Sequence, residues 1–307
     1  MTTTTTTTTA TWPNNLAAAP DSEHQQLQDF VLPSGSVEST LAFFTQPPNG
    51  EQGFKHNGDW KGKFPNGLPE MNFTLVKHKI MMNDFRQHDD DFRLAKNGIR
   101  VPSGIQTRLT EGDYNQTGFD NILLKESTQL LDDLLKAEGL SGEAIHAYDW
   151  TFRAPNSHRH PEFNVHVDHN ESTMRQTVDK WLADKAETFE GKRIRIYNIW
   201  QPLGRALYSN PLALCDPLTI KTKDLVDVEI RYPGVTWSSV GMAHTKDQTW
   251  YHVPGMRPDE RLVFLSYDTS ESKESTLRVP HSSFHDPRTQ PGAPPRVSVE
   301  TRVLVVG

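Results

Sequence analysis

The stretch EFNVHVDH, residues 162–169, has strand character and carries a histidine and an aspartate two residues apart. In a β-strand the side chains of residues i and i+2 leave the same face of the sheet. His166 and Asp168 are therefore expected to point the same way and to supply two of the three ligands of a facial metal site. The third ligand must come from another part of the chain.

The C-terminal part of the chain offers that third ligand. His281 follows the largely apolar stretch LRVP, 277–280, and lies far enough beyond His166 for several strands of a barrel to intervene. Two imidazoles and one carboxylate on one face of a metal ion leave the opposite positions open, which is the arrangement of non-haem Fe(II) oxygenases. A His-x-Asp pair occurs by chance in many chains, so His166 taken alone is more often an ordinary surface or core histidine. The addition of His281 favours a metal site.

A candidate anion-binding pair lies on the expected last strand. Arg296 and Ser298 are spaced to share one strand face. A guanidinium fork and a hydroxyl can bind a carboxylate in bidentate fashion, as the distal carboxylate of 2-oxoglutarate would require. Arg302 has the same parity and is the competing anchor. Taken alone, Arg296 would be interpreted as an exposed arginine at a strand end.

The composition narrows the classes of partner. The 307 residues carry a net charge of −7 with scattered basic residues, so the basic surface of a nucleic-acid-binding protein is missing. Cys215 is the only cysteine, which excludes an internal disulfide and a cysteine-rich zinc site and suits a reducing compartment. No apolar run is long enough for a membrane span, and the N-terminus lacks the features of a secretion signal. We expect a cytoplasmic protein that binds a small molecule, and a homodimer is compatible with the sequence.

The chain divides into a tail and one domain. Residues 1–22 form a threonine-rich tail that cannot bury enough apolar surface to fold, so we expect it to be disordered. Residues 23–69 contain short apolar pieces between turn signals such as PPNG at 47–50, which predicts an irregular layer around a core. Residues 23–307 are interpreted as a single domain.

Strand patterns outnumber helical patterns in the rest of the chain. Helices are expected at 121–137 and 174–188, the second capped by Ser172 or Thr173. Strands are expected at 72–80, 144–153, 193–200, 226–231, 249–253, 261–267 and 297–306. Many short strands with few helices predict a mainly β fold of sandwich or barrel type with flanking α-helices.

Five blocks of sequence resemble one enzyme family. They are NIWQPL at 198–203, PLALCD at 211–216, WYHVPGM at 250–256, PHSSF at 280–284 and PPRVSVETR at 294–302. In this order they are similar to the fungal hydroxylase/desaturase family that includes gibberellin A4 desaturase-like and aspergillic-acid hydroxylase/desaturase-like enzymes. The likeness runs from about Met71 to the C-terminus and leaves the threonine tail outside.

The resemblance implies a double-stranded β-helix, or jelly-roll and cupin-like, core that uses Fe(II), 2-oxoglutarate and O2. It implies that His166, Asp168 and His281 are the iron ligands and that Arg296, with Ser298, anchors 2-oxoglutarate. It also implies an enzyme of fungal secondary metabolism that decarboxylates 2-oxoglutarate to succinate and oxidises an unactivated C–H bond of a small molecule. The outcome would be hydroxylation, desaturation or oxidative cyclisation.

Five residues are expected to line the substrate pocket. They are Asn198, Trp200, Gln201, Tyr251 and Arg153. Trp200 on a strand would more often belong to the core. Members of the family tend to have an arginine at the position of Gln201, so this chain would recognise a different group there.

Two other classes of function compete with this interpretation. One is a metal-dependent cupin-type enzyme that does not use 2-oxoglutarate, in which Arg296 would be structural. The other is a non-catalytic binding module that has reused a metal site. Formation of succinate by the iron-loaded protein separates both from a 2-oxoglutarate-dependent oxygenase.

Overall fold

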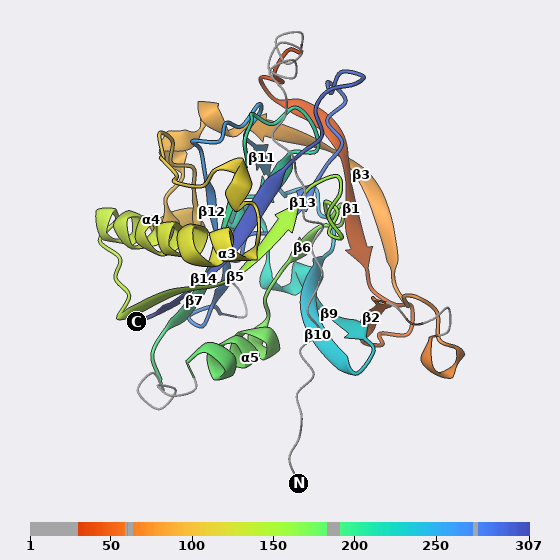
Figure 1. Ribbon diagram of the computed structural model, residues 1–307. Helices are drawn as coiled ribbons and strands as arrows, with labels where there is room; N and C mark the ends of the chain where they lie inside the picture. Colours follow the sequence, from red (N-terminus) through yellow and green to blue (C-terminus); the bar gives the residue numbers. More distant parts are fainter. Residues whose placement is uncertain (1–29, 59, 61–63, 183–190, 273–275) are drawn as a thin grey trace.

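The computed structural model describes residues 30–307 except 59, 61–63, 183–190 and 273–275 (Figure 1). The tail predicted for residues 1–22 lies outside the described residues, and the single domain over 23–307 stays a prediction. No helix in the described part of the chain is long and apolar enough to cross a membrane.

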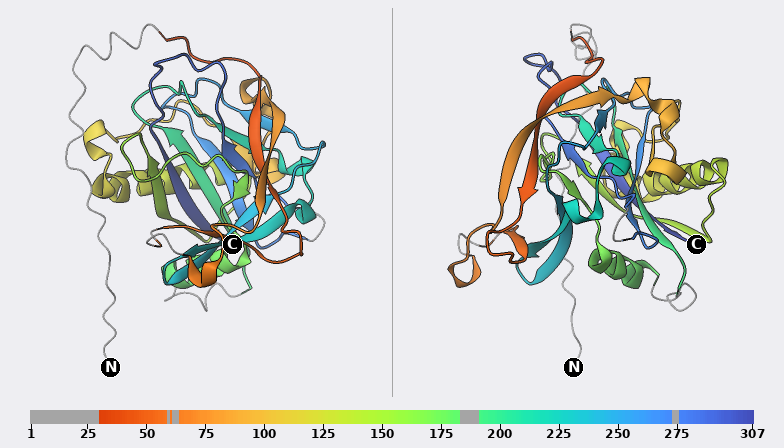
Figure 2. Two further views of the ribbon diagram at one scale, coloured as in Figure 1. Left: turned by 90° about the vertical axis from the view of Figure 1, so that its right-hand side faces the viewer. Right: turned by 180° about the vertical axis from the view of Figure 1, so that it is seen from behind.

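The larger of two sheets has nine strands and curls back on itself. Its strands, in spatial order, are β1 (Val37–Thr45), β3 (Thr74–Asp84), β11 (Trp250–His252), β8 (Leu212–Cys215), β13 (His281–Ser283), β6 (His166–Val167), β10 (Val235–Met242), β9 (Leu225–Tyr232) and β2 (Gly53–His56). The curl brings β1 beside the segment that leads into β6, where the Val165 N–H donates to the Ala42 carbonyl at 2.8 Å. Figure 2 shows β1 and β3 as a long ribbon at one side of the molecule.

The smaller sheet has five strands and packs against the larger one. Its strands, in spatial order, are β4 (Ile99–Arg100), β12 (Leu262–Asp268), β7 (Ile194–Pro202), β14 (Ser298–Val306) and β5 (Ala144–Arg153). One apolar cluster joins the sheets, because it contains Trp200 and Phe264 of the smaller sheet and Leu212 and Leu214 of the larger one. The prediction of a mainly β fold with a few flanking helices is confirmed.

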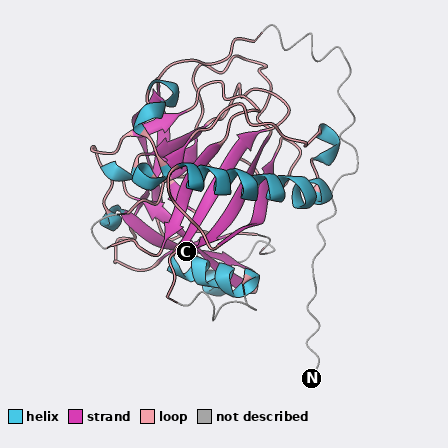
Figure 3. Ribbon diagram, turned by 90° about the vertical axis from the view of Figure 1, so that its left-hand side faces the viewer, coloured by secondary structure: helices cyan, strands magenta, loops and turns pink. Residues whose placement is uncertain are grey.

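The two faces of strand β14 have different surroundings, helix α4 (Leu124–Ala137) on one side and the larger sheet on the other. Val303 and Val305 belong to the cluster that contains Leu131 and Leu135 of this helix. Figure 3 shows α4 lying across this sheet. Residues of the other parity, Ser298, Glu300 and Arg302, leave the opposite face, toward the larger sheet. A polar row therefore faces the interior on a strand whose other side is apolar except for Thr301.

Helix α5 (Glu171–Trp181) follows the metal-site stretch directly. Asn170 caps it, with its side chain accepting from the Thr173 N–H at 3.0 Å. The sequence-based prediction of Ser172 or Thr173 as the cap is therefore wrong. Asparagine is among the best N-cap residues and precedes both candidates, so the helix begins earlier than predicted.

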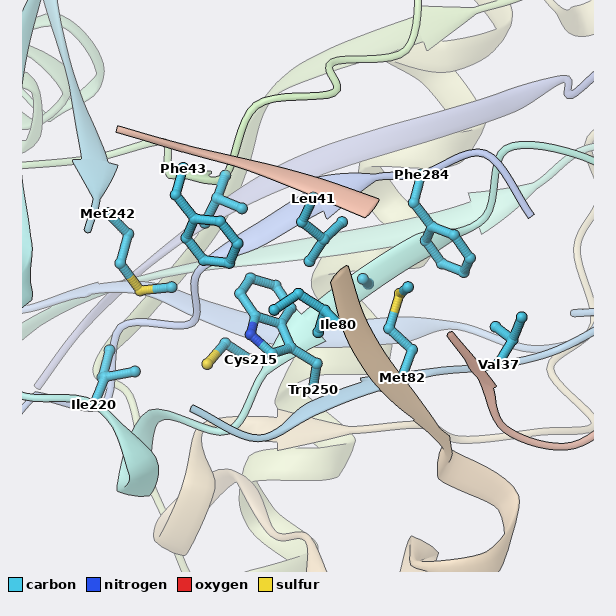
Figure 4. Packing of buried hydrophobic residues seen from close by; sticks show 12 residues of the cluster. Val37, Leu41, Phe43, Ile80, Met82, Cys215, Ile220, Met242, Trp250 and Phe284 are labelled. Atoms are coloured by element: carbon cyan, nitrogen blue, oxygen red, sulfur yellow. The ribbon is translucent and has the colours of Figure 1, made fainter. Parts of the chain in front are cut away.

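A tightly packed cluster fills the curl of the larger sheet (Figure 4). Trp250, Phe43, Met82 and Phe284 form its bulk, and Cys215 is buried among them. Next to this cluster, a Cβ atom on Gly241 would lie 2.9 Å from Cβ and Cγ of Phe44. Only glycine therefore allows β10 to approach β1 this closely.

The structure corrects two expectations about strands. The strand predicted around the stretch at 162–169 is reduced to His166–Val167, so Asp168 lies just past its end. The layer predicted to be irregular at 23–69 contains β1 and β2, both part of the larger sheet. Frequent Pro-Gly turn signals in this region obscured two strands whose stability comes from tertiary pairing.

Replacement of Gly241 by alanine is expected to destabilise the protein by about 1–3 kcal/mol, because the added methyl group overpacks the contact with Phe44. Denaturant unfolding would measure the loss. Gly112→Ala is the matched control, because its added Cβ would meet nothing closer than 3.7 Å. Equal stabilities of the two variants would contradict this account of the close approach.

Candidate metal centre

His166, Asp168 and His281 come together between the two sheets. Strands β6 and β13 are antiparallel neighbours, and their register places His281 directly beside His166. One ligand atom from each of the three residues lies within 4.8 Å of the other two. Asp168 Oδ1 is 3.4 Å from His166 Nε2 and 3.9 Å from His281 Nε2. Strand pairing thus brings together the candidate ligand pair, His166 and Asp168, and the candidate third ligand, His281, which is distant in the sequence.

Backbone carbonyls fix the orientation of both imidazoles. Nδ1 of His166 lies 2.7 Å from the Asn164 carbonyl, and Nδ1 of His281 lies 3.2 Å from the Val279 carbonyl. A carbonyl oxygen only accepts, so the proton sits on Nδ1 and the Nε2 lone pair faces the cluster. This is the tautomer that a metal ion requires.

The charges of the cluster suit a divalent cation. Burial, together with the neighbouring His166, lowers the pKa of His281 to about 3, so this imidazole is neutral at pH 7. Burial alone would raise the pKa of Asp168, but the Arg302 guanidinium and both histidines hold it well below its usual value. Burial alone would lower the pKa of His166, but its hydrogen bond to Asp168 and the charge of that carboxylate raise it. Two imidazoles and one carboxylate match the donor set of a two-histidine, one-carboxylate iron site, in which a metal ion would replace the proton between His166 and Asp168. These residues fit Fe(II).

Asp168 uses its second oxygen for contacts with the smaller sheet. Oδ2 accepts from Asn198 Nδ2 at 2.8 Å, and from Nε and Nη2 of Arg302 at 3.0 and 2.9 Å. Arg302 also donates to Asp149 at 2.8 Å and to Glu300 at 3.0 Å. The guanidinium of Arg302 is therefore already paired with carboxylates.

Arg296 lies in a different environment. Its side chain is buried, and Nη1 donates at 2.8 Å both to the Asn210 carbonyl and to Ser283 Oγ. Its Nε and the Oγ of Ser298 are both buried, and neither has a hydrogen-bond partner in the part of the chain that the structure describes. Among the described residues no carboxylate forms an ion pair with Arg296, and burial with nearby Arg153 lowers its pKa to about 9. Because buried charges in proteins are normally paired, this site is suited to an anionic ligand.

The residues predicted to line the pocket are only partly brought together. The Trp200 ring lies 5.5 Å from the Arg296 guanidinium. Arg153 is paired with Ser298 in the sheet register and donates to the His160 carbonyl. Both lie near the candidate anion site.

The other three predicted pocket residues lie elsewhere or act differently. Asn198 contacts Asp168, as described above. Tyr251 packs between Phe92 and His88, with ring centroids 4.9 and 5.4 Å away. Gln201 has the opposite strand parity to Trp200 and lines a small cavity with Ser127 of α4. Its position beneath α4 argues against a contact with substrate.

Sequence reasoning missed Glu300 and Ser283. Glu300 is buried and bonded to Arg302, and burial raises its pKa. Ser283 holds Arg296, and it lies two residues after His281 on the same strand face. Polar residues at every second position of an otherwise apolar strand were the signal in the sequence that could have found Glu300.

Comparisons with known proteins give a consistent result. Residues 41–306 match the family model described as an oxidoreductase/YMDC permease-like domain. The chain is 31% identical over 274 residues to hydroxylase/desaturase CTB9 of Cercospora beticola, covering 84% of this chain and 74% of that protein. It is 28% identical over 249 residues to the Fe(II)/2-oxoglutarate-dependent dioxygenase nvfI of Aspergillus novofumigatus, covering 78% and 87%.

A solved structure shares the fold. The iron and alpha-ketoglutarate-dependent endoperoxidase NvfI superimposes with a TM-score of 0.75 at 22% identity, covering 89% of this chain and 98% of that one. This likeness supports the predicted jelly-roll core.

Asp168→Ala and His281→Ala are each expected to abolish tight binding of a divalent metal, because each removes one of three ligand atoms. Titration of metal-free protein with Co(II), followed by visible absorption, would measure it. His146→Ala is the control, since His146 is exposed on β5 near Trp181. Retention of wild-type affinity in either ligand variant would show that the metal site is elsewhere.

Proposed function

Because this chain belongs to the family of fungal Fe(II)/2-oxoglutarate-dependent hydroxylases and desaturases, we propose that it oxidises a C–H bond of a small molecule of secondary metabolism, with His166, Asp168 and His281 as the iron ligands. The chain is an enzyme, a dioxygenase whose cofactor is Fe(II) and whose co-substrates are 2-oxoglutarate and O2. The observation that carries the assignment of the ligands is the meeting of two Nε2 atoms and one carboxylate oxygen between the sheets.

Bound Fe(II) would supply the redox chemistry that couples conversion of 2-oxoglutarate and O2 into succinate and CO2 to oxidation of the substrate. His166, Asp168 and His281 would hold the metal ion, and a site with three protein ligands of this kind leaves positions open for co-substrates. Asn164 and Val279 orient the imidazoles through their carbonyls, so the protein supplies this set of ligands pre-formed.

Arg296 and Ser298 are the anchor for the distal carboxylate of 2-oxoglutarate. Three observations support this role: Arg296 is buried, it has no carboxylate partner among the described residues, and both its Nε and the Ser298 hydroxyl have unused hydrogen-bonding capacity. Ser283 links this site to the metal cluster, because it contacts Arg296 and follows His281 on β13. Arg302 is the weaker candidate, since carboxylates already occupy its donors.

The substrate is held beside the anchor. Arg153 lies within electrostatic reach of Arg296 and Asp168 there, and the Trp200 ring, part of the core cluster between the sheets, packs 5.5 Å from the Arg296 guanidinium. Whether hydroxylation, desaturation or cyclisation results depends on which substrate carbon these side chains hold against the reactive centre. The cytoplasmic location and the homodimer stay predictions from the sequence.

Replacement of Arg296 by glutamine is expected to raise the 2-oxoglutarate concentration needed for half-maximal succinate formation by about tenfold or more. The reason is the loss of a charge-assisted hydrogen bond, worth about 1.5–3 kcal/mol. Succinate would be measured over a series of 2-oxoglutarate concentrations with Fe(II) and O2 present.

Arg261→Gln is the matched control for this experiment. Arg261 is as deeply buried as Arg296, but it lines the cavity beneath α4 on the other face of the smaller sheet. An unchanged requirement for 2-oxoglutarate in Arg296→Gln would place the anchor elsewhere. No succinate from wild-type protein that binds Fe(II), with any substrate tried, would favour a cupin-type enzyme that does not use 2-oxoglutarate.

A further inference from the structure

The two oxygens of the Asp168 carboxylate have separate tasks. Oδ1 faces the imidazoles of His166 and His281. Oδ2 faces away from them and accepts three hydrogen bonds, all from side chains of the smaller sheet. Asn198 on β7 and Arg302 on β14 are paired in the register of that sheet, so their donors reach Oδ2 side by side.

This division matters because a carboxylate can bind a metal through one oxygen or through both. A facial site works only if the positions opposite the protein ligands stay open for co-substrates. If Asp168 turned so that both oxygens bound the metal, it would take a position that a co-substrate needs. An oxygen that already accepts three hydrogen bonds strongly resists such a turn.

We propose that Arg302, together with Asn198, is a positioning residue that holds Asp168 as a one-oxygen ligand, and that Arg302 does not bind 2-oxoglutarate. This inference rests on the proposed function, because it takes Asp168 as an iron ligand. It adds the physical reason why the aspartate presents a single oxygen.

The surroundings of Arg302 fix it in this role. Besides Asp168, it donates to Asp149 at 2.8 Å, Glu300 at 3.0 Å and the Thr151 hydroxyl at 3.2 Å. Its side chain is only 16% exposed. Nε and Nη2 together form the fork that contacts one carboxylate oxygen, and a lysine has no such fork. The geometry therefore requires arginine, beyond the need for a positive charge.

The first experiment titrates metal-free protein with Co(II) and records the visible spectrum of the bound ion. Arg302→Gln is expected to weaken Co(II) binding about 10- to 100-fold, the usual effect of removing a side chain that orients a metal ligand. The spectrum should also change, because the coordination by Asp168 changes. Arg302→Lys should recover part of the affinity, since it restores the charge without the fork.

Two further variants keep the test decisive. Asn198→Ala removes one of the three hydrogen bonds and no charge, so it should weaken Co(II) binding less than Arg302→Gln does. If Arg302→Gln fails to fold, the affinity of Asn198→Ala for Co(II) decides the question. Arg278→Gln is the matched control, because Arg278 and Glu271 form a comparably buried ion pair, 11% and 12% exposed, that does not involve the cluster. Wild-type affinity and spectrum in both Arg302→Gln and Asn198→Ala would overturn the inference.

The second experiment separates positioning from anchoring. 2-Oxopentanoate has the length of 2-oxoglutarate but lacks its distal carboxylate, so the ratio of the two affinities measures the anchor alone. Arg302→Gln should weaken both compounds equally and leave the ratio unchanged, whereas Arg296→Gln should lower the ratio about tenfold or more. A lowered ratio in Arg302→Gln would make Arg302 an anchor and refute its assignment as a positioning residue.

Failure of the proposed function would look different. In that case the wild-type protein would bind Co(II) no more tightly than His166→Ala does. Substitution of Arg302 or Asn198 would then not change the affinity for Co(II). Tight binding by wild type and loss in His166→Ala, with no effect of Arg302→Gln or Asn198→Ala, would reject only the role of Arg302 and Asn198.

Discussion

The ion pair between Asp168 and Arg302 is the point at which the two sheets of this protein are joined through the functional site. Asp168 comes from the end of β6 in the larger sheet, and Arg302 comes from β14 in the smaller one. Breaking a buried pair by removing one partner typically costs about 3–5 kcal/mol, because an uncompensated charge is left behind. A shift of one sheet against the other would break this pair and misplace the carboxylate at the same time. This contact therefore ties the position of the Asp168 carboxylate to the alignment of the two sheets.

Three arginines near the metal cluster are distinguished by their partners. Arg302 is paired with carboxylates of the protein, Arg296 donates to a carbonyl and a hydroxyl, and Arg153 donates to a carbonyl in the following loop. In the proposed site, the same residue type thus pairs with protein carboxylates at one position and would bind an anionic ligand at another. The difference is that protein carboxylates neutralise the charge of Arg302, whereas no carboxylate of the described residues forms an ion pair with Arg296.

Much of this arrangement could be predicted from the sequence, for identifiable reasons. The alternation along β14 placed Ser298 and Arg302 on one face, and the spacing of His166 and Asp168 brought both to one side even though the strand ends at Val167. The choice between Arg296 and Arg302 could not be made from parity, since both share it. It depends on partners such as Glu300 and Asp149, which tertiary packing brings into contact.

The placement of Gln201 in the pocket stays a prediction from its position in a family block, and its strand parity, opposite to that of Asn198 and Trp200, speaks against it. The expectation of an irregular layer at 23–69 failed because a local pattern was outweighed. Strands β1 and β2 were hidden among turn signals, because their pairing partners, β3 and β9, are distant in the sequence.

The contact between β1 and the segment before β6 has a consequence for shortening the chain. The Val165 N–H donates to Ala42, and the neighbouring Asn164 carbonyl orients His166. A protein trimmed within Val37–Thr45 would lose the brace behind a proposed metal ligand, although the cut lies far from that ligand in the sequence. Residues before Val37 contribute no strand to either sheet in the described part of the chain, but the Ser36 hydroxyl accepts from the Asp84 N–H at the end of β3 at 3.0 Å, and the Gly35 carbonyl accepts from Arg288 at 3.0 Å. Trimming as far as β1 would therefore already remove contacts that support the larger sheet.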